Sequence, residues 1–417
     1  MACYMVQNMK DTKYILGTEE NLEFQRSIRR NLIEFGRRFP SPTGGSYWLS
    51  DDGTPETDRD RETWITCRMI HVYSIASIMG DRSCAALAEA GIAGLRGELK
   101  DSKNGGWFRG VTKEGKPLED KQCYAHAFVM LAASSALLAG INGAGALLSE
   151  AEEVYDKYFW DADAGLAKDT WNTEFTELSS YRGINANMHT VEAFLAIADA
   201  TGDDKYRESA GGIIKRVVEW ASENEWRIPE HFTEDWEPDL EYNADRKDDK
   251  FKPYGATPGH GIEWARLITQ WATSVYGAGA ELEKYISAAE ALFDRAVADA
   301  WNVDGAPGIV YTTDWQGNPV VHDRMHWTLA EAINTSAVLY NTTGKQAYAD
   351  LYAEFMKYLD ECVLDHKNGS WFHQLDRENR PIGTVWPGKS DLYHAFQSTI
   401  IPFIKQNISI ASGVSAE

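Results

Sequence analysis

Two glutamates follow histidines at a spacing of three residues, and both pairs stand where a helix is expected to begin. His260 and Glu263 occur in GATPGHGIEWARL, and His189 and Glu192 occur in YRGINANMHTVEAF. Residues three apart share one face of a helix. His394 opens a further expected helix with the tripeptide HAF. Imidazole takes and returns protons near neutral pH, so these side chains are candidates for general acid–base catalysis.

Each of these residues also has a simpler interpretation. A histidine at the start of a helix can be a core residue whose ring nitrogens are satisfied, and a His-x-x-Glu pair can ligate a metal. No third and fourth carboxylates follow at a matching spacing, so we expect no metal and no other cofactor. Three histidines at equivalent helix starts favour a shared chemical role.

The segment before His394 occurs twice in the chain. Residues 103–110 read KNGGWFRG and residues 367–374 read KNGSWFHQ, and each copy runs into a turn that is followed by HAF, at His126 and at His394. Weaker copies are AGLAKDTW before NANMHTVEAF and APGIVYTTDW before MHWTLAEAI. Internal repeats indicate a repeated structural unit. We expect a connector that forms a strand, a turn and a return strand, and then enters a helix.

Apolar residues recur at helical spacing in twelve segments, joined in pairs by short turns. Paired helices bury a continuous core only when the pairs stack or close into a ring. We therefore predict an all-α fold, an (α/α)6 barrel of six helical hairpins forming one catalytic domain over residues 1–417. Short β-hairpin connectors would lie over the end that holds the pocket. The expected helices cover residues 20–38, 62–80, 83–100, 122–139, 146–159, 188–201, 204–223, 260–276, 281–300, 326–343, 345–364 and 391–405.

Charge and cysteine content narrow the class of protein. The net charge of −22 argues against a nucleic-acid partner, because phosphate binding needs a basic surface. The uncharged run of residues 122–149 is long enough to resemble a membrane span, but the sequence GINGAG divides it, so we expect two helix ends and no membrane partner. Residues 1–14 lack the pattern of a signal peptide. Five dispersed cysteines without a CxxC pair are typical of reduced thiols, and we expect a cytoplasmic protein: Cys3, Cys67, Cys84, Cys123 and Cys362.

Four strings in this sequence together resemble one known family. YRGINANMHTVEAF, PYGATPGHGIEWARL, WTLAEAI and DLYHAFQ are similar to the N-acylglucosamine 2-epimerase superfamily, in particular to its aldose–ketose isomerase branch. The resemblance covers nearly the whole chain, including ETWITCRMIHVYS at residues 62–74. It implies an (α/α)6 barrel in which His260 and His394 carry catalysis. It also implies a sugar pocket lined by Arg68, Tyr124, Asn185, His189, Glu263, Trp327 and Glu331.

Moving a proton between C1 and C2 of a sugar requires a base for the carbon-bound proton and an acid or base that opens the ring. We assign His394 to the first role and His260 to the second, although the two roles can be exchanged. Glu263 would orient His260, and Glu331 or His189 would bind sugar hydroxyls.

Arg68 would stabilise developing oxygen charge or clamp the far end of the substrate, and its simpler interpretation is a salt bridge between helices. Trp327 and Trp386 offer flat apolar faces to the sugar. The charged segment of residues 237–259 is either a lid over the pocket or a solvated loop.

We therefore expect an isomerase that interconverts D-mannose and D-fructose, and also D-lyxose and D-xylulose, through a cis-enediol and without a metal. Its partner is a small-molecule monosaccharide, and a homo-oligomer is left open. His373, which would contact the sugar, and Lys250 favour a neutral aldose over a sulfonated one. The alternatives are a sulfoquinovose–sulfofructose isomerase, a sugar 2-epimerase, a binding protein, and a glycoside hydrolase that uses Asp169, Glu263 or Glu331.

Overall fold

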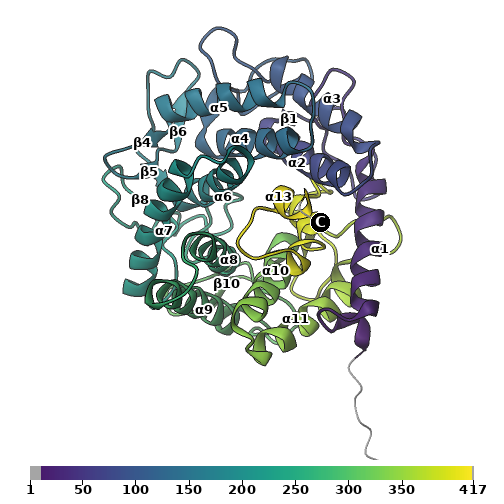
Figure 1. The fold of residues 1–417 in the computed structure, drawn as a ribbon, viewed down its shortest axis with the longest axis vertical. Coiled ribbons are helices and arrows are strands. Elements are labelled where there is room, and N and C mark those ends of the chain that lie inside the picture. Colours follow the sequence, from purple (N-terminus) through teal and green to yellow (C-terminus); the bar gives the residue numbers. More distant parts are fainter. Residues whose placement is uncertain (1–10, 416–417) are drawn as a thin grey trace, which may run out of the picture.

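The helices alternate between an inner and an outer ring, as Figure 1 shows, in a computed structural model that describes residues 11–415. The inner ring consists of α2 (Thr63–Ile78), α4 (Cys123–Leu138), α6 (Ile184–Thr201), α8 (Pro258–Val275), α10 (His326–Thr343) and α12 (Tyr393–Gln397). The outer ring consists of α1 (Glu19–Gly36), α3 (Cys84–Arg96), α5 (Ala144–Tyr158), α7 (Lys205–Glu223), α9 (Ala280–Ala300) and α11 (Gln346–Tyr358). The (α/α)6 barrel expected from the sequence is confirmed.

The two rings differ in the pattern of their apolar residues. In α2 every residue from Thr63 to Ala76 is buried, since an inner helix is covered on all sides. The outer helix α7 buries one face only, with apolar residues such as Ile213, Val217 and Trp220 recurring at helical spacing. Burial on one face holds the outer helices against the inner ring, and this leaves the ends of the inner helices free to form a site.

The last expected helix differs from the prediction. Instead of running over residues 391–405, α12 ends at Gln397, a 3₁₀ turn follows at Ile401–Phe403, and a further helix, α13 (Ile410–Ser415), enters the barrel. Pro402 has no amide hydrogen with which to continue an α-helix, and it lies in the first turn of the 3₁₀ segment. The short α13 packs against α2, α4 and α6. The C-terminal segment therefore fills the centre of the ring in Figure 1.

The connectors form six two-stranded antiparallel sheets among residues 11–415. Two are hairpins within one connector, as predicted: β4 (Trp160–Asp161) with β5 (Leu166–Ala167), and β9 (Thr312–Thr313) with β10 (Pro319–Val321). The other four join different connectors, which the sequence analysis did not predict. These are β1 (Arg61–Glu62) with β2 (Gly110–Val111), β3 (Asp120–Gln122) with β6 (Thr170–Asn172), β7 (Arg182–Gly183) with β8 (His231–Phe232), and β11 (Arg324–Met325) with β12 (Gln374–Leu375). Connectors linked in this way fix the starts of the inner helices.

The two copies of the repeated connector share a buried ion pair. Lys121 Nζ lies 2.8 Å from an Asp101 carboxylate oxygen and donates to the Gly105 carbonyl. Lys389 Nζ lies 2.7 Å from Asp365 and donates to the carbonyl of Gly369. All four charged side chains are buried, and a buried charge is tolerated only when it is paired and hydrogen-bonded. In both copies, the buried ion pair therefore joins the connector to the residues just before the following inner helix.

His126, the partner of His394 in the repeat, has a structural role. Its Nδ1 lies 2.8 Å from the Gln122 carbonyl and its Nε2 accepts a hydrogen bond from the Trp107 backbone N–H. Burial lowers the pKa of His126 to about 3, so the ring is neutral. The simpler interpretation of a histidine at a helix start is correct for His126.

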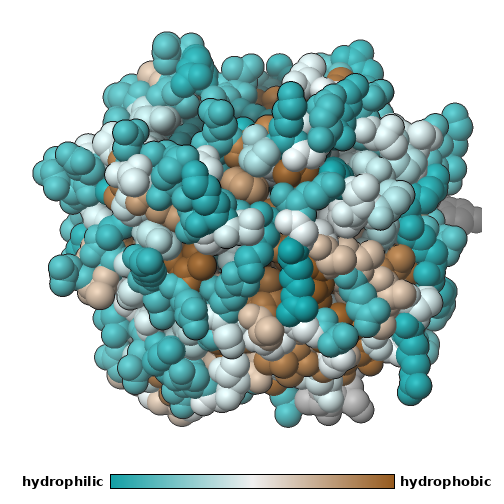
Figure 2. All heavy atoms as spheres, turned by 90° about the horizontal axis from the view of Figure 1, so that it is seen from above, coloured by the Kyte–Doolittle hydropathy of each residue, from teal (hydrophilic) through white to brown (hydrophobic). Residues whose placement is uncertain are grey.

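One face of the molecular surface is largely polar (Figure 2), and the described cysteines are unpaired. The side of the molecule seen in Figure 2 is mostly hydrophilic, with hydrophobic atoms in patches between polar side chains. Among residues 11–415 no helix has the length and apolar character needed to cross a bilayer. Cys67, Cys84, Cys123 and Cys362 are free thiols. Cys3 and most of the segment tested for a signal peptide lie outside the described residues.

Candidate active site

A pocket opens where the first turns of the inner helices meet the connectors. The pocket is open to solvent, and the space between its lining residues, open solvent included, is about 600 Å³. All the site residues expected from the sequence line it, except Glu331 and His373: Arg68, Tyr124, Asn185, His189, His260, Glu263, Trp327, Trp386 and His394. The sequence analysis named no role for several other lining residues, among them Tyr311, His326 and Asp391.

His394 is backed by a buried carboxylate. Its Nδ1 lies 2.9 Å from Glu331 Oε1, and the other Glu331 oxygen accepts a hydrogen bond of 2.8 Å from Arg266 Nε. Burial raises the pKa of this carboxyl, but the Arg266 guanidinium and His394 outweigh it and keep the pKa below its usual range. An ionised Glu331 places the proton of the imidazole on Nδ1 and leaves the Nε2 lone pair free. Because burial also lowers the pKa of His394, its neutral form is favoured, and the ring can act as a base.

His260 is backed by a second carboxylate, but not by the one predicted. Its Nδ1 lies 2.9 Å from Oε2 of Glu230, which is buried. We expected Glu263 to orient His260, but Glu230 holds this place in the structure. Glu230 precedes β8, and the connector brings it to the start of α8 from thirty residues away. No local spacing could have revealed it, because the contact depends on the fold.

The two histidines lie against one indole. The ring centroid of Trp327 is 5.1 Å from that of His260 and 5.8 Å from that of His394. The indole of Trp327 thus lies beside both imidazoles, and each imidazole is held by a carboxylate. A substrate that packs on this indole would have two imidazoles near it. Both can carry protons, as transfer between neighbouring carbons and their oxygens requires.

Arg68 supplies positive charge to the pocket. Its Nη1 lies 3.1 Å from Asp391 Oδ2, and its Nη2 donates to the Tyr124 hydroxyl at 2.8 Å. The salt bridge between helices that was the simpler interpretation is therefore present, but the same residue also lines the pocket. Although burial opposes it, Arg68 holds the pKa of Asp391 below its ordinary value. Asp391 stands three residues before His394, so its place could have been inferred from the sequence.

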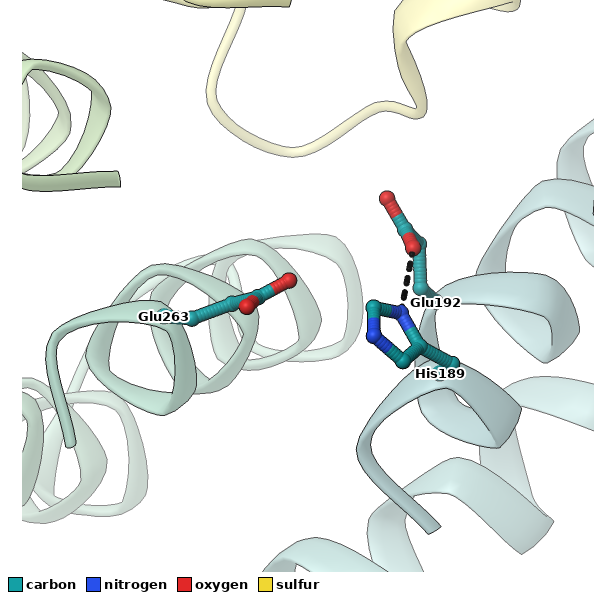
Figure 3. Close-up of side chains that lie close together, drawn as sticks. All are labelled: His189, Glu192 and Glu263. Carbon is teal, nitrogen blue, oxygen red and sulfur yellow. Dashed lines mark hydrogen bonds and ion pairs between the residues drawn. The ribbon is translucent and has the colours of Figure 1, made fainter. Parts of the chain in front are cut away.

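The second His-x-x-Glu pair, on α6, points toward Glu263 on α8, as Figure 3 shows. His189 Nδ1 lies 3.2 Å from Glu192, and burial lowers the pKa of His189 to about 4. Burial and the nearby Glu331 carboxylate raise the pKa of Glu263 well above its ordinary value. The raised pKa favours the neutral acid form of Glu263, which can donate a hydrogen bond to a sugar oxygen.

Two groups of side chains are close enough to hold a metal ion. His189 and Glu192 gather with Glu263, and Glu331 and His394 also gather with Glu263, with ligand atoms in each group within 4.8 Å of one another. The sequence analysis expected no further carboxylate beside the His-x-x-Glu pair, so Glu263 is a correction. Arg266 lies 3.4 Å from Glu263 and 2.8 Å from Glu331. A guanidinium already neutralises this charge, and a protonated Glu263 is a poor ligand.

Several buried polar atoms around the pocket lack a protein partner among residues 11–415. Two are donors, Arg68 Nε and Trp386 Nε1, and two can accept, Asn185 Oδ1 and His326 Nε2. Buried polar groups are nearly always hydrogen-bonded in folded proteins. A ligand with several hydroxyl groups, each able to donate and accept, would satisfy this set.

Glu331 and His373 lie behind the pocket wall rather than in it. Glu331 is fully buried and occupied by Arg266 and His394. His373 stacks on His326, which covers it. Both were expected to contact sugar, and the structure places them behind residues that line the cavity. Arg266, which the sequence analysis missed, follows Glu263 by three residues and so could have been placed on the same face.

Part of the charged segment of residues 237–259 packs over the pocket. Lys250, Phe251 and Pro253 line it. The Lys250 ammonium lies 4.7 Å from the ring centroid of Trp48 and 4.3 Å from that of Trp386. Burial lowers the pKa of Lys250 to about 8. This end of the segment covers the pocket, as a lid would, and is not a merely solvated loop.

Acid should destabilise the protein before its carboxylates titrate. Burial lowers the pKa of His71, His189 and His373 from 6.5 to about 4. In the unfolded chain these rings bind protons near pH 6.5, so each group costs up to about 1.4 kcal/mol of stability per pH unit as the pH falls below that value. Carboxyls whose pKa is raised by burial, Glu263 most of all, oppose this trend, but burial also lowers the pKa of further histidines. We expect the melting temperature to fall between pH 7 and pH 5. A melting temperature that is constant over this range would contradict the burial of neutral histidines.

The chain is similar to one family model and to several named proteins. The family model described as N-acylglucosamine 2-epimerase matches residues 44–398. A D-mannose isomerase from Pseudomonas cannabina pv. alisalensis is 42% identical over 88% of this chain and 89% of its own. A D-mannose isomerase from Thermobifida fusca is 41% identical over 93% of this chain and 95% of its own. A crystal structure of a D-mannose isomerase, 28% identical, superimposes with a TM-score of 0.85 over 91% of this chain and 97% of that one.

Proposed function

Because the chain belongs to the N-acylglucosamine 2-epimerase family, we propose that it is an aldose–ketose isomerase that interconverts D-mannose and D-fructose. D-lyxose and D-xylulose form a second pair of substrates, since the two aldoses share their configuration from C2 to C4. The observation that carries the proposal is the pair of imidazoles across Trp327, each held by a buried carboxylate. The similarity to two D-mannose isomerases over about nine-tenths of the chain supports the choice of sugar.

The reaction uses Nε2 of His260 and Nε2 of His394, the ring nitrogens that do not contact a carboxylate. His260 moves the proton between the ring oxygen and the C1 hydroxyl, which opens the pyranose. Nε2 of His394 then takes the proton from C2, and a cis-enediolate forms with its charge on O1. His260 carries the proton of O2 to O1 by way of the cis-enediol, and His394 returns its proton to C1, so that C2 becomes the ketone. Atoms and charge balance without an outside oxidant.

The other residues of the pocket hold the sugar and its developing charge. Arg68, fixed by Asp391 and Tyr124, stabilises charge on oxygen as the enediol forms. The neutral Glu263 donates a hydrogen bond, and Asn185 and His189 meet further hydroxyls. Trp327 and Trp386 face the C–H groups of the sugar. The route calls for no metal, and we expect EDTA to leave the activity unchanged.

The carboxylates favour isomerisation over glycoside hydrolysis. A hydrolase needs two carboxyl groups free to act on either side of the substrate. Of the three named earlier, Glu331 is buried behind His394, and Asp169 lines a neighbouring cavity rather than this pocket. Among the residues that line the pocket, the remaining carboxylate, Asp391, is tied to Arg68. Glu263 thus has no free partner.

A sulfonated hexose and 2-epimerisation remain as competing outcomes. A sulfonate favours the planar fork of an arginine, whereas the cation of the segment over the pocket is Lys250, which is held between two indoles. Epimerisation would return the proton to C2 on the other face rather than to C1.

One assay separates these functions. The purified protein is given D-mannose, sulfoquinovose, D-glucose and an aryl mannoside in parallel, and the products are identified by NMR. We expect fructose from mannose, with kcat/KM for mannose exceeding that for sulfoquinovose. A hundredfold preference for sulfoquinovose, about 2.7 kcal/mol in transition-state binding, would overturn the choice of substrate. Release of the aryl group, or glucose from mannose without fructose, would overturn the reaction.

A further inference from the structure

Two imidazoles stack at the edge of the pocket, one in its wall and one behind it. The rings of His326 and His373 have centroids 3.7 Å apart, and their planes are within 12° of parallel. His326 is the first residue of α10 and lines the pocket, whereas His373 lies behind it in the second copy of the repeated connector. Neither ring has a role in the proton transfers described above.

Both rings are neutral. They are buried, and burial lowers the pKa of His373 to about 4 and that of His326 well below its ordinary value. Two stacked imidazolium ions would repel each other at this distance, and nearby like charge disfavours the charged form. The Ser390 backbone N–H points at His373 Nδ1 at 3.3 Å, so that nitrogen accepts a hydrogen bond.

The hydrogen bonds also fix the tautomer of His326. Its Nδ1 lies 3.3 Å from the backbone carbonyl of His373. A carbonyl oxygen can only accept, so Nδ1 carries the single N–H of the neutral ring and Nε2 carries a lone pair. Nε2 is buried and meets no partner within residues 11–415. A buried acceptor without a donor is costly, so this atom calls for a donor from a ligand or a solvent molecule.

We propose that Nε2 of His326 accepts a hydrogen bond from one hydroxyl of the bound aldose, which makes His326 a specificity-determining residue. The inference rests on the proposed isomerase function. The stacked His373 and its carbonyl hold the ring so that it presents a pure acceptor. The wall therefore recognises a hydroxyl that donates, and it rejects a sugar in which that position is deoxygenated or methylated.

The experiment crosses sugars with variants of His326. The sugars are D-mannose and its derivatives deoxygenated or O-methylated at C3, C4 or C6, and the readout is the ratio of kcat/KM between mannose and each derivative. In the wild type we expect one of these three positions to differ from the other two. At that position, deoxygenation and O-methylation should each lower kcat/KM about tenfold more than they do at the others. In His326→Phe, which keeps a flat ring on His373, that extra penalty should disappear.

Gln and Asn variants provide a matched pair. The side-chain oxygen of Gln reaches about the position of Nε2, whereas that of Asn falls short near Nδ1. His326→Gln should keep the penalty and His326→Asn should lose it, and this comparison decides the matter if His326→Phe does not fold. If the loss of kcat/KM at that sugar position is the same in the wild type, His326→Phe and His326→Asn, the proposal is wrong. A water molecule would then be the donor to Nε2. If the wild type does not isomerise mannose at all, the proposed function fails instead, and the two failures are distinct.

Discussion

Replacing His394 by asparagine should lower kcat for mannose by about a thousandfold or more while the protein remains folded. A positioned general base contributes about 10²- to 10⁴-fold, and His394 would be the group that handles the carbon-bound proton, the hardest to remove. Asparagine can still donate to Glu331 but has no basic nitrogen to offer to C2. The measurement is kcat and KM for mannose, with the melting temperature of each preparation. Because the substitution removes a proton carrier and few sugar contacts, KM should change much less than kcat.

The repeat supplies a matched control in His126. It occupies the equivalent place in the other HAF copy and is as buried as His394, but its nitrogens bind Gln122 and Trp107. His126→Asn should lower the melting temperature and keep kcat per folded molecule close to that of the wild type. If His394→Asn keeps near wild-type turnover, or if both variants lose activity only as far as they unfold, the assignment of His394 is wrong.

Replacing His260 by asparagine should lower kcat by about a hundredfold or more, since proton transfer to and from the oxygens would lose its carrier. Glu230→Gln should have a smaller effect, about tenfold to a hundredfold, because the imidazole stays but loses a charged hydrogen-bond partner at 2.9 Å. The double variant should be no worse than His260→Asn alone, because Glu230 would act only through His260. Steady-state kinetics of the two single variants and the double variant measure this.

A second histidine–carboxylate pair serves as the control. His322 Nδ1 lies 2.8 Å from Asp304 and is not among the residues that line the pocket. His322→Asn should leave kcat and KM for mannose unchanged. Additive losses in His260→Asn and Glu230→Gln would show that Glu230 acts independently of His260, and would contradict the pairing.

The fold was largely predictable because its signals are local and repeated. Helical spacing marked the hairpins, and the two KNG segments marked equivalent connectors. The end of α12 was missed although Pro402 could have been noticed. The short α13 has little periodicity of its own, and its position depends on packing against three inner helices.

The site was predictable where chemistry and spacing coincide. His260, His394 and Arg68 were found through the family motifs, and the structure brings them into one pocket. Glu230 was not found, because a connector brings it to His260 from a distant part of the sequence. His373 was expected at the sugar, yet His326 covers it. The fold decides which side chains line the pocket and which lie behind them. The residue types along the chain do not reveal this.

The central claim is that a histidine carries a proton between C1 and C2, and isotope transfer tests it most directly. Mannose is converted to fructose in deuterium oxide, and in parallel mannose labelled with deuterium at C2 is converted in ordinary water. We expect solvent deuterium at C1 of the fructose in the first reaction, and loss of label to water in the second, because a protonated imidazole exchanges with solvent. Fructose without solvent deuterium, together with complete transfer of the C2 label to C1 and a requirement for added metal, would contradict the account and indicate a hydride shift.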